Sequence, residues 1–388
     1  MTRGRTVFLL ASGLLVVSIL SGVVVGVQAV QTERPKDSFY KYLSVFSEVL
    51  RLVRQSYVDE TELRTLIAGA LEGSSDALDP FSMYIPESDV ESYLVAREIG
   101  PRRSGLRVVK VRGAAYVMAV QEGSPAAEAG FLRGDIMTQV GGLSTRGMPL
   151  WEIERRLAGP VGSHLDFQIL RAGKTTEKTL ELGTFDGPVA EVEDVDGSPL
   201  LRIPTFDGVE SVAELVRGLE GDRLLVDLRG VAWGDTEAAY AVAKLFVQGE
   251  LGVLLGRDGP VKTFSSTEEV WEGRLVVLID RGSQGPAEIL ATILQQGAGA
   301  SLVGQPSFGF AGQTRIVDLE AGGSLLITDG FYTGPDGEPL NEGLAPDLRV
   351  GDRGRSFTER DDDMEDLILR RALELLASDE ETELDEAA

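Results

Sequence analysis

The stretch "LVVLIDRGSQGPAEILATILQQ", residues 275–296, decides how this chain folds and what it can do. An apolar run leads into a tight turn rich in Gly, Ser and Pro, and a helix is predicted to follow. Many hydrolases place a nucleophile on such a strand–turn–helix, with the N-terminus of the helix behind it. The residue at the centre of this turn is Gly285, which has no side chain. The sequence therefore raises the question of whether the chain has a nucleophile at all.

The composition excludes several classes of function. A length of 388 residues predicts two or three domains. The 37 basic and 62 acidic residues give a net charge of −25, which disfavours binding to nucleic acid. The absence of Cys excludes disulfides, thiolate catalysis and Cys-based metal sites. His164 is the single histidine, so no histidine metal cluster is possible and we expect neither a metal nor a cofactor.

The N-terminus is predicted to carry the body of the chain across a membrane. Residues 6–32 contain no charged residue, Arg3 and Arg5 precede them, and Glu33 follows. An apolar run of this length can span a bilayer as a helix. Arg on the near side keeps the N-terminus inside. We expect a signal anchor over 1–32, in the inner membrane, with the body in the periplasm or otherwise outside the cytoplasm. Cleavage after Ala29 in "VQA" is the alternative.

The body of the chain divides by pattern into three regions and a tail. Residues 33–102 are predicted to be mainly helical, with Tyr42, Val45, Phe46, Val49 and Leu52 at helical spacing within 38–72. Residues 103–183 contain short strands separated by Gly turns, and two helices in "SPAAEAG" and "MPLWEIERRLAG".

Residues 184–358 alternate strands and helices, which predicts an α/β core with parallel pairing. Within it, 223–230 and 273–280 are expected as strands, and 235–249 as a helix. Residues 359–377 are predicted to form an amphipathic helix, with one face made of Met364, Leu367, Ile368, Leu375 and Leu376. The acidic residues 378–388 are expected to form a tail.

Several motifs in this order resemble those of the C-terminal processing peptidases, the tail-specific serine proteases of family S41. "YVDETEL" (57–63) and "LDPFSMY" (78–84) are similar to segments at the family's N-terminus, and "GSPAAEAGFLRGDIMTQVGGLSTRGM" (123–148) to its PDZ domain. "LLVDLRG" (224–230), "GQPSFGFAGQT" (304–314) and "FYTGPDGEPLNEGLAPDLRV" (331–350) are similar to its core motifs. The resemblance implies an α/β fold: a helical N-terminal region, a PDZ-like α+β domain and a peptidase core of the ClpP/crotonase type.

The resemblance also places the catalytic positions, and both are altered here. The family's nucleophile is the middle Ser of "SASAS", three residues before a Glu; counting back from Glu288 reaches Gly285. The family's general base is the Lys of "FGKG", and Phe310 stands there, 25 residues after Gly285 (310 − 285). Gly has no hydroxyl and Phe cannot accept a proton, so neither half of a Ser/Lys dyad is present. No Lys follows Lys262, and Arg stays protonated.

The segment that corresponds to the oxyanion hole also differs from the family pattern in a way that disfavours catalysis. The family's "DLRNNPGG" corresponds to "DLRGVAWGD" (227–235), in which Trp233 replaces the first of two Gly and Gly234 follows. A bulky indole crowds the place where an acyl oxyanion would sit. The chain is therefore predicted to be an inactive homologue. The alternative is an active serine peptidase with a relocated nucleophile, Ser283 or Ser307, and Lys262 or Lys244 as base.

The PDZ-like module keeps more of the family pattern. In "SGLRV" (104–108), Gly105, Leu106 and Val108 match the carboxylate-binding loop, and Arg107 stands where Gly is usual. Arg107 could strengthen carboxylate binding or block the loop. The helix residues predicted to wall a peptide groove are Leu150, Ile153 and Leu157; alternatively these three belong only to the core.

The predicted function is therefore the binding of protein or peptide C-terminal tails at the cell envelope. The expected partners are such tails, an envelope protease or its regulator, and the membrane. A structural envelope protein that binds no peptide is the remaining alternative.

Overall fold

The computed structural model describes residues 35–187, 189–268, 270–351 and 362–378. The predicted anchor (1–32) and all but the first residue of the acidic tail lie outside these ranges. Within them, no helix combines the length and the hydropathy that a membrane span requires. The chain divides into two compact units, Met1–Ala70 and Leu71–Ala388, which are described separately.

In the first unit, helix α2 (Pro35–Ser56) is followed by the start of α3 (Leu63–Asp76). The helical spacing found within 38–72 is interrupted at 57–62, where the chain leaves the helix. Val58, Asp59 and Thr61 fall in this break, and all three residue types have low helix propensity. The apolar face that was predicted on α2 exists, and its side chains are exposed, including Tyr42 at 71%.

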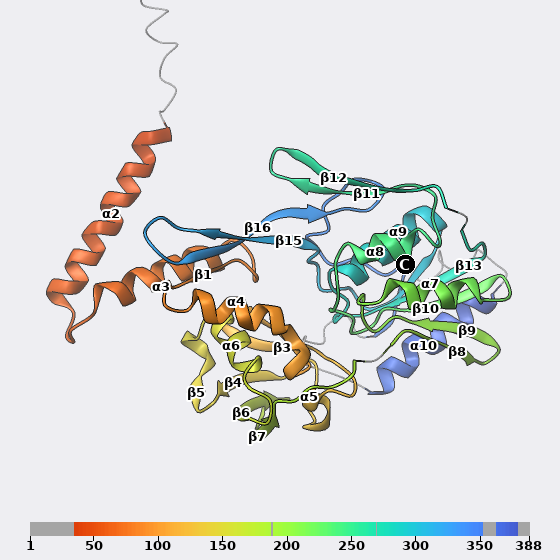
Figure 1. Cartoon of the computed structure of the whole chain (residues 1–388), viewed down its shortest axis with the longest axis horizontal. Coiled ribbons are helices and arrows are strands. Elements are labelled where there is room, and N and C mark those ends of the chain that lie inside the picture. Colours follow the sequence, from red (N-terminus) through yellow and green to blue (C-terminus); the bar gives the residue numbers. More distant parts are fainter. Residues whose placement is uncertain (1–34, 188, 269, 352–361, 379–388) are drawn as a thin grey trace, which may run out of the picture. The chain divides into compact units, whose positions relative to one another are not determined.

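The second unit contains the PDZ-like module as an antiparallel sheet in the order β2-β3-β4-β6-β7, with β5 beside β4 (Figure 1). The strands are β2 (Leu106–Val111), β3 (Ala114–Val120), β4 (Ile136–Val140), β5 (Leu143–Ser144), β6 (His164–Arg171) and β7 (Lys174–Glu181). The short helix α5 (Pro125–Glu128) and the amphipathic helix α6 (Leu150–Leu157) follow β3 and β5. Because β2 is at the end of the sheet order, one of its edges pairs with no strand in the described part of the chain.

The α/β core is built on a six-stranded sheet in the order β17-β14-β13-β10-β9-β8. Pairing is parallel from β17 to β9, and β8 is antiparallel. The strands are β8 (Glu191–Val195), β9 (Ser198–Arg202), β10 (Arg223–Asp227), β13 (Arg274–Ile279), β14 (Ser301–Gly304) and β17 (Leu348–Arg349). The expected parallel pairing is thus present, as nearly continuous apolar strands predict for a sheet covered on both faces.

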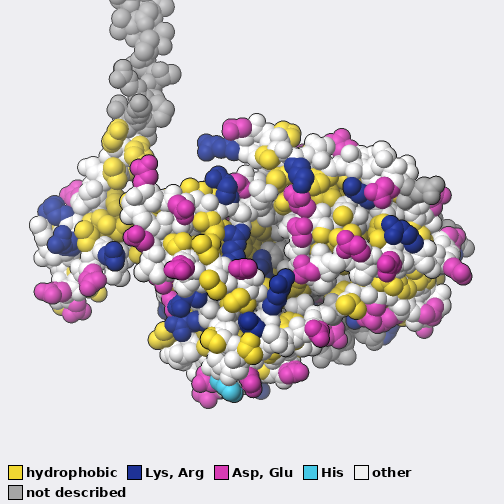
Figure 2. All heavy atoms as spheres, viewed as in Figure 1, with side chains coloured by type: hydrophobic (Ala, Val, Ile, Leu, Met, Phe, Trp, Pro, Cys, Tyr) yellow, Lys and Arg dark blue, Asp and Glu magenta, His cyan; other side chains and the backbone are white. Residues whose placement is uncertain are grey.

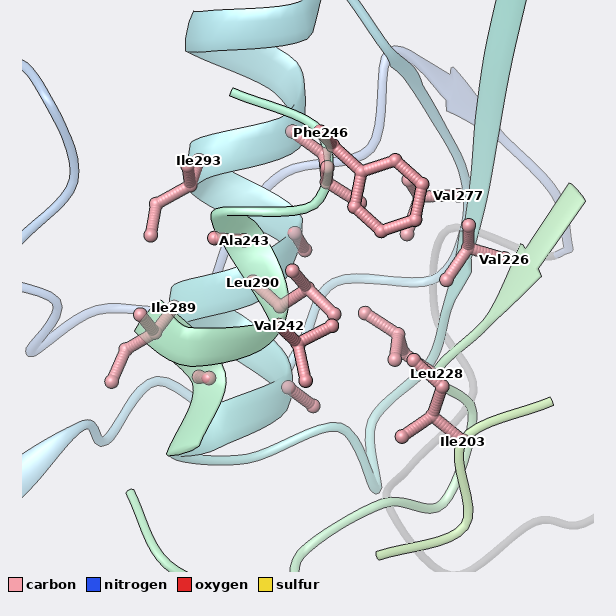
Figure 3. Packing of buried hydrophobic residues seen from close by; sticks show 14 of the residues in the cluster. Ile203, Val226, Leu228, Val242, Ala243, Phe246, Val277, Ile289, Leu290 and Ile293 are labelled. Atoms are coloured by element: carbon pink, nitrogen blue, oxygen red, sulfur yellow. The ribbon is translucent and has the colours of Figure 1, made fainter. Parts of the chain in front are cut away.

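Helices cover both faces of this sheet. Helices α7 (Val209–Arg217), α8 (Ala238–Ala243) and α9 (Pro286–Ala298) pack on one face, and α10 (Asp362–Ala377) packs on the other. Alternate residues of a strand point to opposite faces. Val226 and Val277 therefore meet α8 and α9, as Figure 3 shows, whereas Leu225 and Val276 meet α10. Of the predicted helix 235–249, only Ala238–Ala243 is helical; a turn follows at 244–246, and strand β11 begins at Gly249.

A third sheet contains β1 (Met83–Ile85), β16 (Ser324–Tyr332), β11 (Gly249–Gly256) and β12 (Gly259–Ser266), with β15 (Gly312–Asp318) beside β16. Strand β1 was not predicted from the sequence. It pairs antiparallel with β16, with Met83 opposite Leu326. Helix α4 (Val90–Ile99) and the 3-10 turn η1 (Gly100–Arg103) then lead into β2.

Candidate functional site

Gly285 lies at the end of the turn between β13 and α9, immediately before the first residue of the helix. Its backbone angles are φ 58° and ψ −108°, a conformation that L side chains rarely adopt. A Cβ at this position would meet only the carbonyl oxygen of Phe310, at an ordinary contact distance of 3.8 Å. Position 285 therefore has room for a side chain, but a residue other than Gly would be strained in its backbone there.

The turn is held by the buried carboxylate of Asp280. Its Oδ1 accepts hydrogen bonds from the N–H groups of Gly230 (2.9 Å) and Gly282 (2.8 Å). Its Oδ2 forms an ion pair with Arg133 of the PDZ-like module. Burial alone would raise the pKa of Asp280, but Arg133 and the two N–H donors outweigh it and hold that pKa below its usual value.

Both serines considered as relocated nucleophiles are engaged in structural hydrogen bonds. The hydroxyl of Ser283 is fully buried, donates to the carbonyl of Leu228 (2.8 Å) and accepts from the N–H of Asp280 (3.0 Å). The hydroxyl of Ser307 donates to Glu288 and accepts from the N–H of Leu344 (2.8 Å). Both hydroxyl groups are therefore committed to hydrogen bonds that hold the turn and the start of α9, and neither faces a lysine or a histidine.

Glu288 connects the two dyad positions. Its Oε2 accepts hydrogen bonds from the N–H groups of Gly285 (3.0 Å) and Phe310 (3.0 Å), and its Oε1 accepts from Ser307 and Gly309. Burial raises the pKa of Glu288 to about 7, although these hydrogen bonds lower it. In the sequence, Glu288 served only to locate the position of Gly285. The signal that could have revealed its role is an acidic residue in the first turn of a buried helix.

The side chain of Phe310 is only 9% exposed and lies in a cluster of rings. Its ring centroid is 4.3 Å from that of Phe81 and 5.6 Å from that of Phe331. We call the aromatic cluster the rings of Phe81, Trp233, Phe308, Phe310 and Phe331. It packs against Val109, Met118 and Ala119 of the PDZ-like module. The position of the family's general base is thus part of an apolar contact between module and core.

Trp233 and Gly234 occupy the region predicted for the oxyanion hole. Trp233 is 5% exposed, and its carbonyl accepts a hydrogen bond from the N–H of Phe206 (3.2 Å). Gly234 has φ 94°, and a Cβ there would lie 2.5 Å from the backbone nitrogen of Phe206. Gly is therefore required at 234 by close backbone approach. Trp233 and Phe310 belong to the same cluster of buried residues.

A cleft of about 1100 Å³ is lined by residues from both sets of predicted site residues. Gly285, Phe310, Trp233 and Gly234 line it on the side of the core. On the PDZ side it is lined by Leu106, Arg107, Val108 and Leu157. Figure 2 shows the hollow and the Lys and Arg side chains gathered beside it.

Three residues predicted to bind peptide do not line the cleft. Leu150 and Ile153 are buried in the core of the PDZ-like module, at 5% and 0% exposure, which favours the purely structural alternative for these two. Gly105 has φ 74°, and a Cβ there would overlap the side chain of Ser124 at 2.0 Å. Its role is to bring the loop close to Ser124.

The two bases considered for a relocated dyad, Lys262 and Lys244, do not line the cleft. Nζ of Lys262 on β12 forms an ion pair with Oε2 of Glu237 at 2.5 Å. The single histidine, His164, is exposed on β6, with its Nε2 3.8 Å from Oε2 of Glu181. Neither lysine nor histidine occurs among the described residues that line the cleft. The described ranges also contain no group of three or more His, Asp or Glu placed to hold a metal ion.

Comparison with known proteins agrees with this architecture. The model of peptidase family S41 matches residues 199–350, and that of the PDZ domain matches 116–171. The chain contains a peptidase S41 domain and a PDZ domain. These two domains and the fold class expected from the motifs are confirmed.

Relatives of this chain are named as C-terminal processing proteases. It is 26% identical over 352 residues to the carboxy-terminal-processing protease of Bartonella bacilliformis, covering 86% of this chain and 80% of that protein. It is 28% identical over 258 residues to the carboxyl-terminal-processing protease of Synechocystis sp., covering 63% of this chain and 60% of that protein. The solved structure of the photosystem II D1 C-terminal processing protease shares the fold, with a TM-score of 0.63, 22% identity, and coverage of 87% and 97%.

Proposed function

We propose that this chain is a non-catalytic member of peptidase family S41 that binds the tails of other proteins in its cleft. One observation carries the proposal: the two positions of the family's dyad are Gly285 and Phe310, and the ring of Phe310 is buried in the aromatic cluster. A serine peptidase needs a hydroxyl and a neighbouring base that takes its proton. The described cleft lining offers no lysine or histidine for that task.

The edge of β2 and the apolar residues beside it support the proposal that the cleft still binds peptides. Strand β2 has an edge free of strand partners in the described residues, and this edge can pair with an extended peptide by strand addition. Leu106, Val108 and Leu157 provide apolar surface beside it. The relatives are named for processing C-terminal ends, so protein C-terminal tails are the natural ligand class to propose here.

The location of the protein is part of the proposal. Arg3 and Arg5 followed by an uncharged stretch at 6–32 favour an anchor with the body outside the cytoplasm. In that compartment the protein would act as an adaptor or regulator of an envelope protease. A reporter fused after Ala388 should be active only outside the cytoplasm, and a cytoplasmic signal would contradict this placement.

Catalytic competence is tested directly with the full-length chain in mild detergent. We expect no cleavage of a casein-like protein above background and no covalent labelling by a fluorophosphonate probe. An active S41 relative serves as the positive control. Labelling at Ser283 or Ser307, or proteolysis that Ser283→Ala abolishes, would instead establish the alternative, a peptidase with a relocated nucleophile.

A further inference from the structure

We infer that the cleft binds acidic peptide segments through the arginines of the η1–β2 loop, and that a free C-terminal carboxylate is not required. This inference rests on the proposed function, because it specifies the ligand of the same cleft. It differs from the expectation for a carboxylate-binding loop, in which backbone amides hold the end of the chain.

The first three backbone donors of the loop, at residues 104–106, are already used. The N–H groups of Ser104 (3.2 Å) and Gly105 (2.7 Å) both donate to the carbonyl of Pro101, and the N–H of Leu106 donates to the hydroxyl of Ser104 (3.2 Å). The loop is also fixed from behind, because Ser124 fills the space beside Gly105. Three consecutive amides are thus directed into the protein, which favours side chains as the donors for a ligand carboxylate.

Arginine side chains supply those donors. Arg102, Arg103 and Arg107 belong to one stretch of six residues, and all three line the cleft together with Arg97 of α4. In the described part of the chain, none of these four arginines forms an ion pair within 4.0 Å. The Nε of Arg107 is buried without a hydrogen-bond partner among those residues, and its guanidinium lies 5.9 Å from the ring centroid of Phe81.

Three acidic residues also line the cleft, Glu98, Glu154 and Asp207. The carboxyl of Glu154 is near Arg97 and Arg107 and is hydrogen-bonded to Tyr93. Burial raises the pKa of Glu154, and the two arginines act against this. The negative charge of Glu154 therefore partly offsets the positive charges of Arg97 and Arg107, whereas Arg102 and Arg103 remain available to bind a ligand. The net charge of the whole chain is −25. Such a basic loop on an acidic protein favours an anionic ligand.

The remaining surface of the cleft identifies that ligand as a peptide. Guanidinium groups bind carboxylates with two parallel hydrogen bonds, and this geometry suits Asp and Glu side chains. The rings of Phe81, Trp233 and Phe310 form an apolar wall in the same cleft, and the open edge of β2 can pair with a peptide backbone. An extended segment that carries both acidic and apolar side chains satisfies all three features.

Fluorescence anisotropy with the full-length chain in mild detergent tests this inference. Four labelled peptides share one apolar sequence of about ten residues. They carry Glu or Gln at three positions and end in a free or an amidated C-terminus. We expect the Glu peptides to bind at least about tenfold more tightly than the Gln peptides, with affinity falling as salt rises. Amidation should change the affinity by less than about threefold.

Variants locate the effect. Arg102→Gln combined with Arg103→Gln should weaken binding of the Glu peptides by at least about tenfold and leave the Gln peptides unchanged. The control, Arg146→Gln with Arg257→Gln, removes two exposed arginines outside the cleft, changes the net charge equally, and should leave both affinities unchanged.

Two further outcomes separate the inference from the proposed function. Equal binding of Glu and Gln peptides, or a requirement for a free C-terminus, overturns the inference and leaves tail binding intact. If no peptide binds, tail binding itself fails and the inference fails with it.

Discussion

Arg133 of the PDZ domain forms an ion pair with Asp280, the buried carboxylate that follows strand β13 of the core. The same carboxylate accepts the N–H groups of Gly230 and Gly282, which belong to the two loops around Gly285. One side chain of the PDZ domain therefore holds the turn in which the family carries its nucleophile. The pair connects residues 147 positions apart in the sequence.

Arg133→Gln should destabilise the protein, because it leaves a buried carboxylate without its counter-charge. We expect a loss of about 3 kcal/mol in the free energy of unfolding, measured by urea denaturation. Arg257→Gln removes an exposed arginine on the β11–β12 hairpin and should change that free energy by less than about 0.5 kcal/mol. Equal stability of the two variants would show that the ion pair contributes little.

The pH dependence of stability should carry a contribution from Glu288. Burial raises its folded-state pKa from 4.5 to about 7. Between these values the folded protein keeps a proton that the unfolded chain has released, so the free energy of unfolding falls as pH rises. The full fall is about 3 kcal/mol, at 1.36 kcal/mol for each pKa unit.

Denaturation from about pH 4.5 to 8 compares the wild type with Glu288→Gln. The variant should be less stable throughout, because an amide group cannot accept all of the hydrogen bonds from Ser307, Gly309, Phe310 and Gly285. The free energy of unfolding of Glu288→Gln should also not show the decrease that the wild type shows between pH 4.5 and about 7. Asp280 contributes to the pH dependence over a different range. Because its folded-state pKa is lowered, its contribution to the free energy of unfolding is lost only as the pH falls below the ordinary carboxyl range. Identical slopes for wild type and Glu288→Gln would refute the assignment.

Much of the core could be predicted because its signals are local. Residues 224–226 and 275–279 are continuous apolar runs, and such runs predict a parallel sheet covered on both faces. The turn before Pro286 and the helix after it follow from residues that are adjacent in the sequence. The positions of Gly285 and Phe310 needed only the spacing of motifs along the chain.

The features that were missed depend on contacts between distant segments. Strand β1 has three residues, and it exists because Met83 pairs with Leu326, 243 positions away (326 − 83). The pairing of Arg133 with Asp280 has no local pattern either. The hydrogen bonds from the N–H groups of Ser104 and Gly105 to the carbonyl of Pro101 depend on the geometry of η1. The sequence of this loop matches a carboxylate-binding loop and does not reveal that these donors are already occupied.

Tail binding should depend on the apolar surface beside β2. Leu106→Asp places a charge on a residue that is 4% exposed and lines the cleft, and it should weaken binding of a tail peptide by at least about tenfold. Leu143→Asp is the matched control, since Leu143 is 51% exposed and outside the cleft. Circular dichroism must show that both variants are folded. Unchanged affinity in folded Leu106→Asp would exclude this wall as part of the site.

Restoring the dyad by Gly285→Ser with Phe310→Lys should not restore proteolysis. The serine fits, because a Cβ at 285 meets only the oxygen of Phe310 at 3.8 Å, and its positive φ costs about 1 kcal/mol. The lysine replaces a ring packed on Phe81 and Phe331, which should cost about 3 kcal/mol. Trp233 remains buried in the region of the oxyanion hole, so the third element of the mechanism is still missing.

Casein cleavage and fluorophosphonate labelling measure this outcome in the double variant and in each single variant. Gly285→Ser alone controls for the strain, and Phe310→Lys alone controls for the lost ring contact. Adding Trp233→Gly to the double variant supplies the remaining change toward the family pattern. Labelling that first appears in this triple variant would show that Trp233 blocks the chemistry. Cleavage by the double variant would show instead that Gly285 and Phe310 alone account for the inactivity that we propose.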